Sequence, residues 1–116
     1  MRGDLLKALL PDLADELERL LALAGRAGLV EQVAQLSIVD RCWCGDDNCA
    51  HFYTAPKPLG SYGPGHANVM LPAERGLLVV DVVDDAIVAV EVLDRPDVKR
   101  LLDLHLPSST PEKVAT

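Results

Sequence analysis

Three cysteines and a histidine lie close together in the middle of the chain, with the spacing C-x-C-x4-C-x-H. The four residues are Cys42, Cys44, Cys49 and His51. Thiolate sulfur and imidazole nitrogen are donors that zinc favours, and four of them around one ion make a closed tetrahedral site. The motif therefore predicts a bound Zn²⁺ with a structural role.

The segment between the second and third cysteines shows how these donors can meet. Residues 45–48 are Gly-Asp-Asp-Asn, which are all turn-forming types. If these residues close a hairpin, Cys44 lies opposite Cys49. Cys42 then lies opposite His51. Side chains alternate across a strand, so all four donors share one face, and cross-strand neighbours about 5 Å apart can converge on one ion.

Several alternatives remain open for this motif. His66 follows a glycine-containing loop and is a second candidate for the fourth ligand, and a water molecule is a third. One alternative is three reduced thiols without metal. Another is a thiol-based redox enzyme or a metal-dependent enzyme that uses Cys42, Cys44 and Cys49. Cys49 as a nucleophile with His51 as its base is a further hypothesis. Such a pair needs a third group to orient the base, and the sequence identifies none. We therefore expect a non-enzymatic protein that acts through contacts with a protein partner, of unspecified identity and oligomeric state.

Length and charge restrict the classes of function. The chain has 116 residues, of which 18 are acidic and 11 basic, giving a net charge of -7. Such a chain offers no positive surface for nucleic acid or an anionic membrane. It has no run of about 20 apolar residues and no apolar leader at its start, so we expect a cytoplasmic location. The charge alone also suggests an acidic protein that neutralises a basic partner.

Leucines recur at helical spacing over residues 6–24, with acidic residues between them. Pro11 suits the first position of a helix but not its interior, so the pattern predicts a short turn and then a main helix from about Pro11 to Ala24, ended by Gly25. A short helix over residues 29–34 and a weak strand over residues 36–41 follow.

The most regular pattern lies in two β-branched runs, residues 77–83 and 86–93. Asp84 and Asp85 separate them, so the pattern predicts a hairpin with its turn at these two residues. Apolar residues do not alternate cleanly with polar ones, which predicts that both faces are covered, one of them by the N-terminal helix. Asp81 is interpreted as an acid at the edge of the sheet.

A C-terminal helix follows, with Asp94 predicted as its N-cap and Pro96 in its first turn. The resulting fold is α+β, with an N-terminal helix, an antiparallel sheet of about four strands in two hairpins, and this last helix. One domain covers residues 1–106, with the cysteine-rich hairpin at 40–55. Residues 107–116 are predicted to form a disordered polar tail.

The motif order also resembles a family of small proteins of unknown function from bacteria with GC-rich genomes. The matching pieces are Cys42-Trp43-Cys44-Gly45, Cys49, Phe52-Tyr53-Thr54 and the segment from Val79 to Leu104. Residues 80–93 are similar to a second small domain of unknown function, whose hairpin turn contains a glycine that Asp84-Asp85 lacks here. Both resemblances imply an architecture, and neither implies a reaction.

Overall fold

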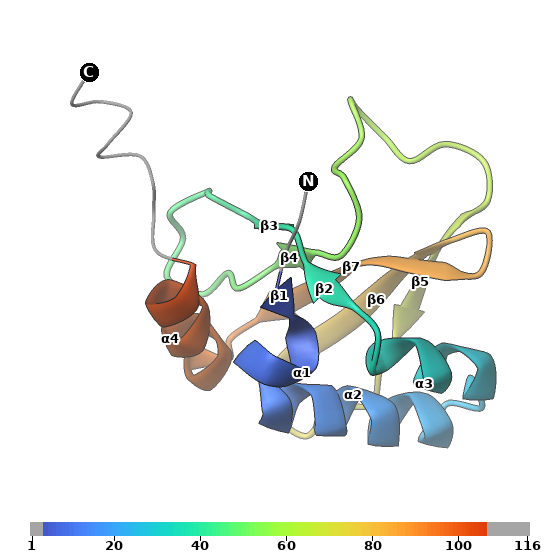
Figure 1. Ribbon diagram of the computed structural model, residues 1–116, viewed down its shortest axis with the longest axis horizontal. Helices are drawn as coiled ribbons and strands as arrows, with labels where there is room; N and C mark the ends of the chain where they lie inside the picture. Colours follow the sequence, from blue (N-terminus) through green and yellow to red (C-terminus); the bar gives the residue numbers. More distant parts are fainter. Residues whose placement is uncertain (1–3, 107–116) are drawn as a thin grey trace.

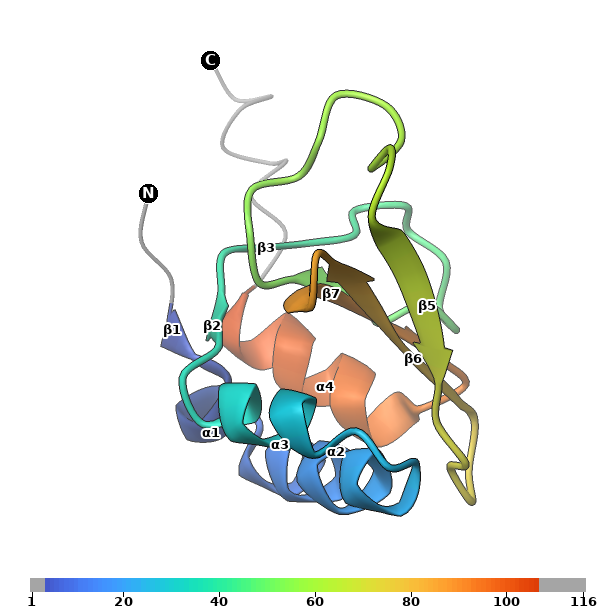
Figure 2. The same ribbon diagram turned by 90° about the vertical axis from the view of Figure 1, so that its right-hand side faces the viewer.

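A computed structural model describes residues 4–106, so the predicted polar tail at 107–116 lies outside the described residues. The described part combines four helices with a two-stranded and a five-stranded antiparallel sheet, which confirms the α+β class. The helices lie on one side of the larger sheet (Figures 1 and 2). Within residues 4–106, no helix has both the length and the apolar character needed to cross a membrane.

The helices follow the apolar and proline pattern of the sequence. They are α1 (Leu6–Leu9), α2 (Pro11–Leu23), α3 (Ala27–Val33) and α4 (Pro96–His105). Pro11 occupies the first turn of α2, as predicted, because its missing N–H is not needed there. Four leucines of α2 are buried and form part of the core: Leu13, Leu17, Leu20 and Leu21.

The larger sheet has the strand order β3-β4-β7-β6-β5. Its strands are β3 (Asp40–Arg41), β4 (Phe52–Tyr53), β5 (His66–Met70), β6 (Leu77–Val83) and β7 (Ala86–Leu93). The smaller sheet pairs β1 (Asp4–Leu5) with β2 (Ser37–Ile38). Both predicted hairpins are present. The sequence missed β5 and β1, and the weak strand over 36–41 divides between the two sheets.

Two predictions about aspartates were wrong. β5 pairs with β6, so Asp81 lies on an interior strand and only 4% of it is exposed, instead of lying at the sheet edge. Asp94 does not cap α4, since the N-cap residue is Arg95, which makes no side-chain capping hydrogen bond. Asp94 instead has a φ of 57°, and it turns the chain between β7 and the helix.

The two faces of the larger sheet differ in chemistry. Alternate residues of β6 and β7, including Leu78, Val80 and Val90, are buried in the core that also contains the helix leucines. We call the opposite side, away from the helices, the outer face. The register places Asn68 beside Asp81 on this face. The loop over residues 54–65 lies above it (Figure 2), so the second cover of the sheet is a loop.

Candidate metal centre

The hairpin that carries the cysteines has the register expected from the sequence. Strand β3 pairs with β4 through Asp40↔Tyr53 and Arg41↔Phe52. One position further, the amide of Cys42 donates to the carbonyl of His51 at 2.9 Å. Cys42 and His51 therefore face each other across the two strands, as predicted.

The turn itself is held by backbone contacts and by Asp46. The Asp46 side chain accepts a hydrogen bond from the amide of Asn48 at 2.8 Å, and its carbonyl accepts one from the amide of Cys49 at 3.1 Å. Gly45 has a φ of 81°, a conformation that side chains with a Cβ disfavour. Cys49 then forms an isolated bridge with Leu93, which joins the turn to β7. The chain thus folds back within a few residues and brings its cysteines together.

The three cysteine sulfurs lie within 4.8 Å of one another. We call Cys42, Cys44 and Cys49 the cysteine cluster; Cys42 is half-buried, Cys44 exposed and Cys49 buried. In tetrahedral zinc sites with Zn–S bonds near 2.3 Å, neighbouring sulfurs are about 3.8 Å apart. Closing the cluster around an ion therefore needs sulfur movements of about 1 Å, and the cluster could hold a metal ion.

The protonation of the three thiols is uneven. The backbone amide of Asp46 hydrogen-bonds to the sulfur of Cys44, and the other two thiols add to this effect, so the pKa of Cys44 is lowered. Burial raises the pKa of Cys49 to about 11. Metal binding at this cluster must displace protons, so its affinity for metal should increase with pH.

The two candidate histidines do not join the cysteine cluster. The Nε2 atom of His51 is buried and has no hydrogen-bond partner among the described residues, and burial lowers the pKa of this side chain. The Nε2 atom of His66 lies 3.0 Å from Oδ1 of Asp81, and its ring lies 4.7 Å from that of Tyr62. The structure thus brings together three of the predicted ligands, and the identity of the fourth stays a prediction.

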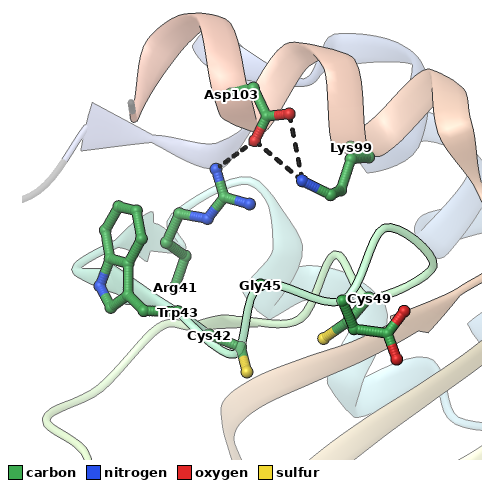
Figure 3. A pocket seen from close by; sticks show the side chains of 8 residues that line it. Arg41, Cys42, Trp43, Gly45, Cys49, Lys99 and Asp103 are labelled. Carbon is green, nitrogen blue, oxygen red and sulfur yellow. Dashed lines mark hydrogen bonds and ion pairs between the residues drawn. The ribbon is translucent and has the colours of Figure 1, made fainter. Parts of the chain in front are cut away.

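An ion-pair network that the sequence did not reveal lies beside the turn. Arg41 is 4% exposed and donates from Nη1 to Asp103 at 2.9 Å and to the carbonyl of Leu106 at 3.1 Å. Lys99 also contacts Asp103, and the guanidinium of Arg41 lies 5.0 Å from the centre of the Trp43 ring. Figure 3 shows the sulfurs of the two labelled cysteines pointing away from this network. No local pattern could have indicated a contact between residues so distant in sequence.

A second cluster of titratable side chains lies on the outer face around Asp81. Its carboxylate accepts hydrogen bonds from His66 and from Nδ2 of Asn68. Glu91 faces the same place, and the distance from Nδ2 of Asn68 to its Oε2 is 3.4 Å. Burial and the neighbouring Asp81 carboxylate raise the pKa of Glu91 to about 7. We call Asp81 and Glu91 the carboxylate pair.

The raised pKa of Glu91 predicts a pH-dependent stability. The folded protein holds a proton that the unfolded chain releases near pH 4.5, so the free energy of unfolding should fall as pH rises toward and through 7. Glu91→Gln should remove this loss. Between pH 5 and pH 8 its free energy of unfolding should fall by about 1 kcal/mol less than that of the unaltered protein, a difference kept small because the side chain is partly exposed.

Urea unfolding of both proteins at pH 5 and pH 8 measures this difference. Glu74→Gln makes the same chemical change at an exposed position and is the control. Equal pH dependence in the unaltered protein and Glu91→Gln would show that Glu91 titrates normally.

Comparisons of the chain with family models, with curated proteins and with solved structures found no significant match. The resemblance to small bacterial proteins of unknown function therefore stays a prediction.

Proposed function

We propose that the cysteine cluster binds one Zn²⁺ as a structural ion and that the protein acts through contacts with another protein. The convergence of the three Sγ atoms within 4.8 Å carries this proposal. Soft thiolate donors favour zinc among the common divalent ions, and thiolate-rich zinc sites are usually closed and structural.

The position of the cluster fits a structural role. Residues 43–48 are exposed and contribute no side chain to the hydrophobic core. The far end of this turn is nevertheless joined to the domain, because the carbonyl of Asn48 accepts a hydrogen bond from the amide of Asp94 at 2.9 Å. A zinc ion would tie Cys42 and Cys44 to Cys49 and so supply the stabilisation that apolar packing does not provide here.

Trp43 supports the proposed contact with another protein. It lies between two of the cysteines, and 44% of this large aromatic side chain is exposed. Tryptophan is enriched among the residues that contribute most to binding at protein interfaces. A zinc ion that orders residues 42–44 would also hold Trp43 in position for a partner.

We propose that His51 becomes the fourth ligand when zinc binds, although its ring lies outside the cysteine cluster in the described structure. His51 faces Cys42 across the two strands, and its Nε2 atom makes no hydrogen bond among residues 4–106. Cobalt substitution tests this choice, because the visible spectrum of Co²⁺ depends on its donors. A spectral change in His51→Ala would support it, and an unchanged spectrum would assign the fourth position to water or to a partner.

Replacing Cys44 by serine tests the proposal as a whole. The unaltered protein should contain about one zinc per chain by elemental analysis, and Cys44→Ser should contain none. Zinc at about 100 times its dissociation constant adds about 3 kcal/mol to the free energy of unfolding. With zinc present, the unaltered protein should therefore be more stable than Cys44→Ser by about this amount. With a chelator present, the two proteins should be equally stable.

Asp47→Asn changes an exposed residue of the same turn and is the control; it should keep both zinc and stability. Loss of zinc in Cys44→Ser without any zinc-dependent loss of stability would contradict a structural role. Zinc retained at full occupancy would contradict the assignment of Cys44 as a ligand.

A thiol-based redox protein is the second candidate, and the exposed sulfur and lowered pKa of Cys44 favour it. The two candidates differ in how Cys44 reacts with an alkylating reagent in zinc-saturated protein. Fast labelling of Cys44 alone would favour redox chemistry, whereas protection by zinc would favour the structural role.

A further inference from the structure

A cavity of about 170 Å³ lies on the outer face of the sheet, beside the loop over residues 54–65. Five of its lining residues carry its chemistry: His51, Tyr53, Tyr62, Asp81 and Glu91. These five side chains supply two phenol rings, one imidazole ring and two carboxyl groups. No lysine or arginine of the described chain lines it.

We propose that this pocket binds the ammonium group of a small organic cation. Aromatic rings attract an ammonium group through the negative potential of their faces, and nearby carboxylates add direct charge attraction. Neither feature favours an anion, and the rings give an advantage to an organic cation over a neutral molecule of the same shape.

The carboxylate pair is the first argument for a cation. Asp81 is almost fully buried, and its partners are His66 and Asn68. Glu91 lies 3.4 Å from Nδ2 of Asn68 and within hydrogen-bonding reach of Asp81 itself. No ion pair between either carboxylate and a lysine or arginine is found within residues 4–106. Two neighbouring carboxylates repel each other in partly buried surroundings, so a bound cation would relieve that repulsion.

The aromatic walls are the second argument. The ring of Tyr62 contacts that of His66 at a tilt of 39°, and His66 in turn contacts Asp81, so the loop's aromatic wall is connected to the carboxylates. The Nζ atom of Lys57 lies 5.3 Å from the centre of the Tyr53 ring. The Tyr53 ring therefore already accepts one ammonium group, although Lys57 is not part of the pocket lining.

A metal ion fits this pocket less well than an organic cation. Metal ions with oxygen ligands need several donors gathered at one point. Among the described residues, three or more histidine, cysteine or acidic side chains lie close enough to hold a metal ion at the cysteine cluster, and no such group is found at this pocket. The carboxylates and tyrosines carry the proposal, which therefore does not depend on whether His51 ligates zinc.

Choline and its neutral isostere 3,3-dimethylbutan-1-ol provide a direct test. Titration of the full chain with each, followed by NMR chemical shifts of the residues around Tyr62, should show saturable binding of choline. Binding of the neutral compound should be at least tenfold weaker. Glu91→Gln should weaken choline binding at least tenfold, and the exposed control Glu74→Gln should leave it unchanged.

Equal binding of the two compounds, or no saturable binding of choline, would overturn the proposal. So would unchanged choline affinity in Glu91→Gln. The comparison of the two compounds uses the unaltered protein, so it does not depend on the folding of a variant. Glu91→Gln should retain the zinc content of the unaltered protein while it loses choline affinity, which separates this proposal from the proposed zinc site.

Discussion

Phe52→Ala is expected to lower the free energy of unfolding by about 4 kcal/mol, since removal of a fully buried phenylalanine side chain costs about 3 to 5 kcal/mol. Phe52 has no exposed surface and lies on β4, between Arg41 of β3 and Val90 of β7. The cavity left by its ring would remove the packing that holds β3 and β7 to β4. Denaturant unfolding measures the loss.

The same substitution should also lower the affinity of the cysteine cluster for zinc. Cys49 lies three residues before Phe52 in the chain, and Cys42 pairs with His51, which directly precedes Phe52. Trp43→Ala is the matched control, because Trp43 is a similarly large aromatic residue but is 44% exposed; it should cost about 1 kcal/mol or less. Similar losses in the two variants would show that Phe52 does not carry the packing around β4.

Arg95→Met is expected to cost about 3 kcal/mol. The side chain of Arg95 is 3% exposed and donates two hydrogen bonds to Glu16 of α2, at 2.9 and 2.8 Å. It also donates to both carboxylate oxygens of Asp97. Methionine fills part of the volume but leaves Glu16 as a partly buried charge without its partner, and breaking a buried pair in this way costs about 3 to 5 kcal/mol.

Arg75→Met gives the comparison for this prediction. Arg75 contacts the same Asp97 at 3.4 Å, but the pair is exposed, so its removal should change stability by less than about 1 kcal/mol. Chemical denaturation of the two variants under the same conditions measures the difference. Equal effects would mean that the Arg95–Glu16 pair contributes no more than a surface ion pair.

The parts of the fold with a regular local pattern could be predicted from the sequence. The β-branched runs define β6 and β7 to the residue, because the turn between them needs two residues with positive φ, and Asp84 and Asp85 have φ values of 50° and 68°. Pro11 likewise marks the start of α2. The turn chemistry of residues 45–48 predicted the pairing of Cys42 with His51.

The remaining features depend on contacts that no local pattern shows. Strand β5 has the sequence His-Ala-Asn-Val-Met, with a single buried residue, so its hydrophobic signal is weak. Its absence from the prediction placed Asp81 at an edge and hid the carboxylate pair. The direction of the His51 ring is set by its surroundings on the sheet, and spacing along the chain does not specify it.

The separation between the two faces of the larger sheet bears on how this protein can evolve. The apolar side chains that stabilise the domain pack between the sheet and the helices. The cysteine turn and the pocket lined by Tyr62 and Glu91 lie outside that core. Substitutions at exposed positions around them would cost little folding stability. One scaffold can therefore acquire new ligand preferences through changes in its loops while its core sequence stays the same.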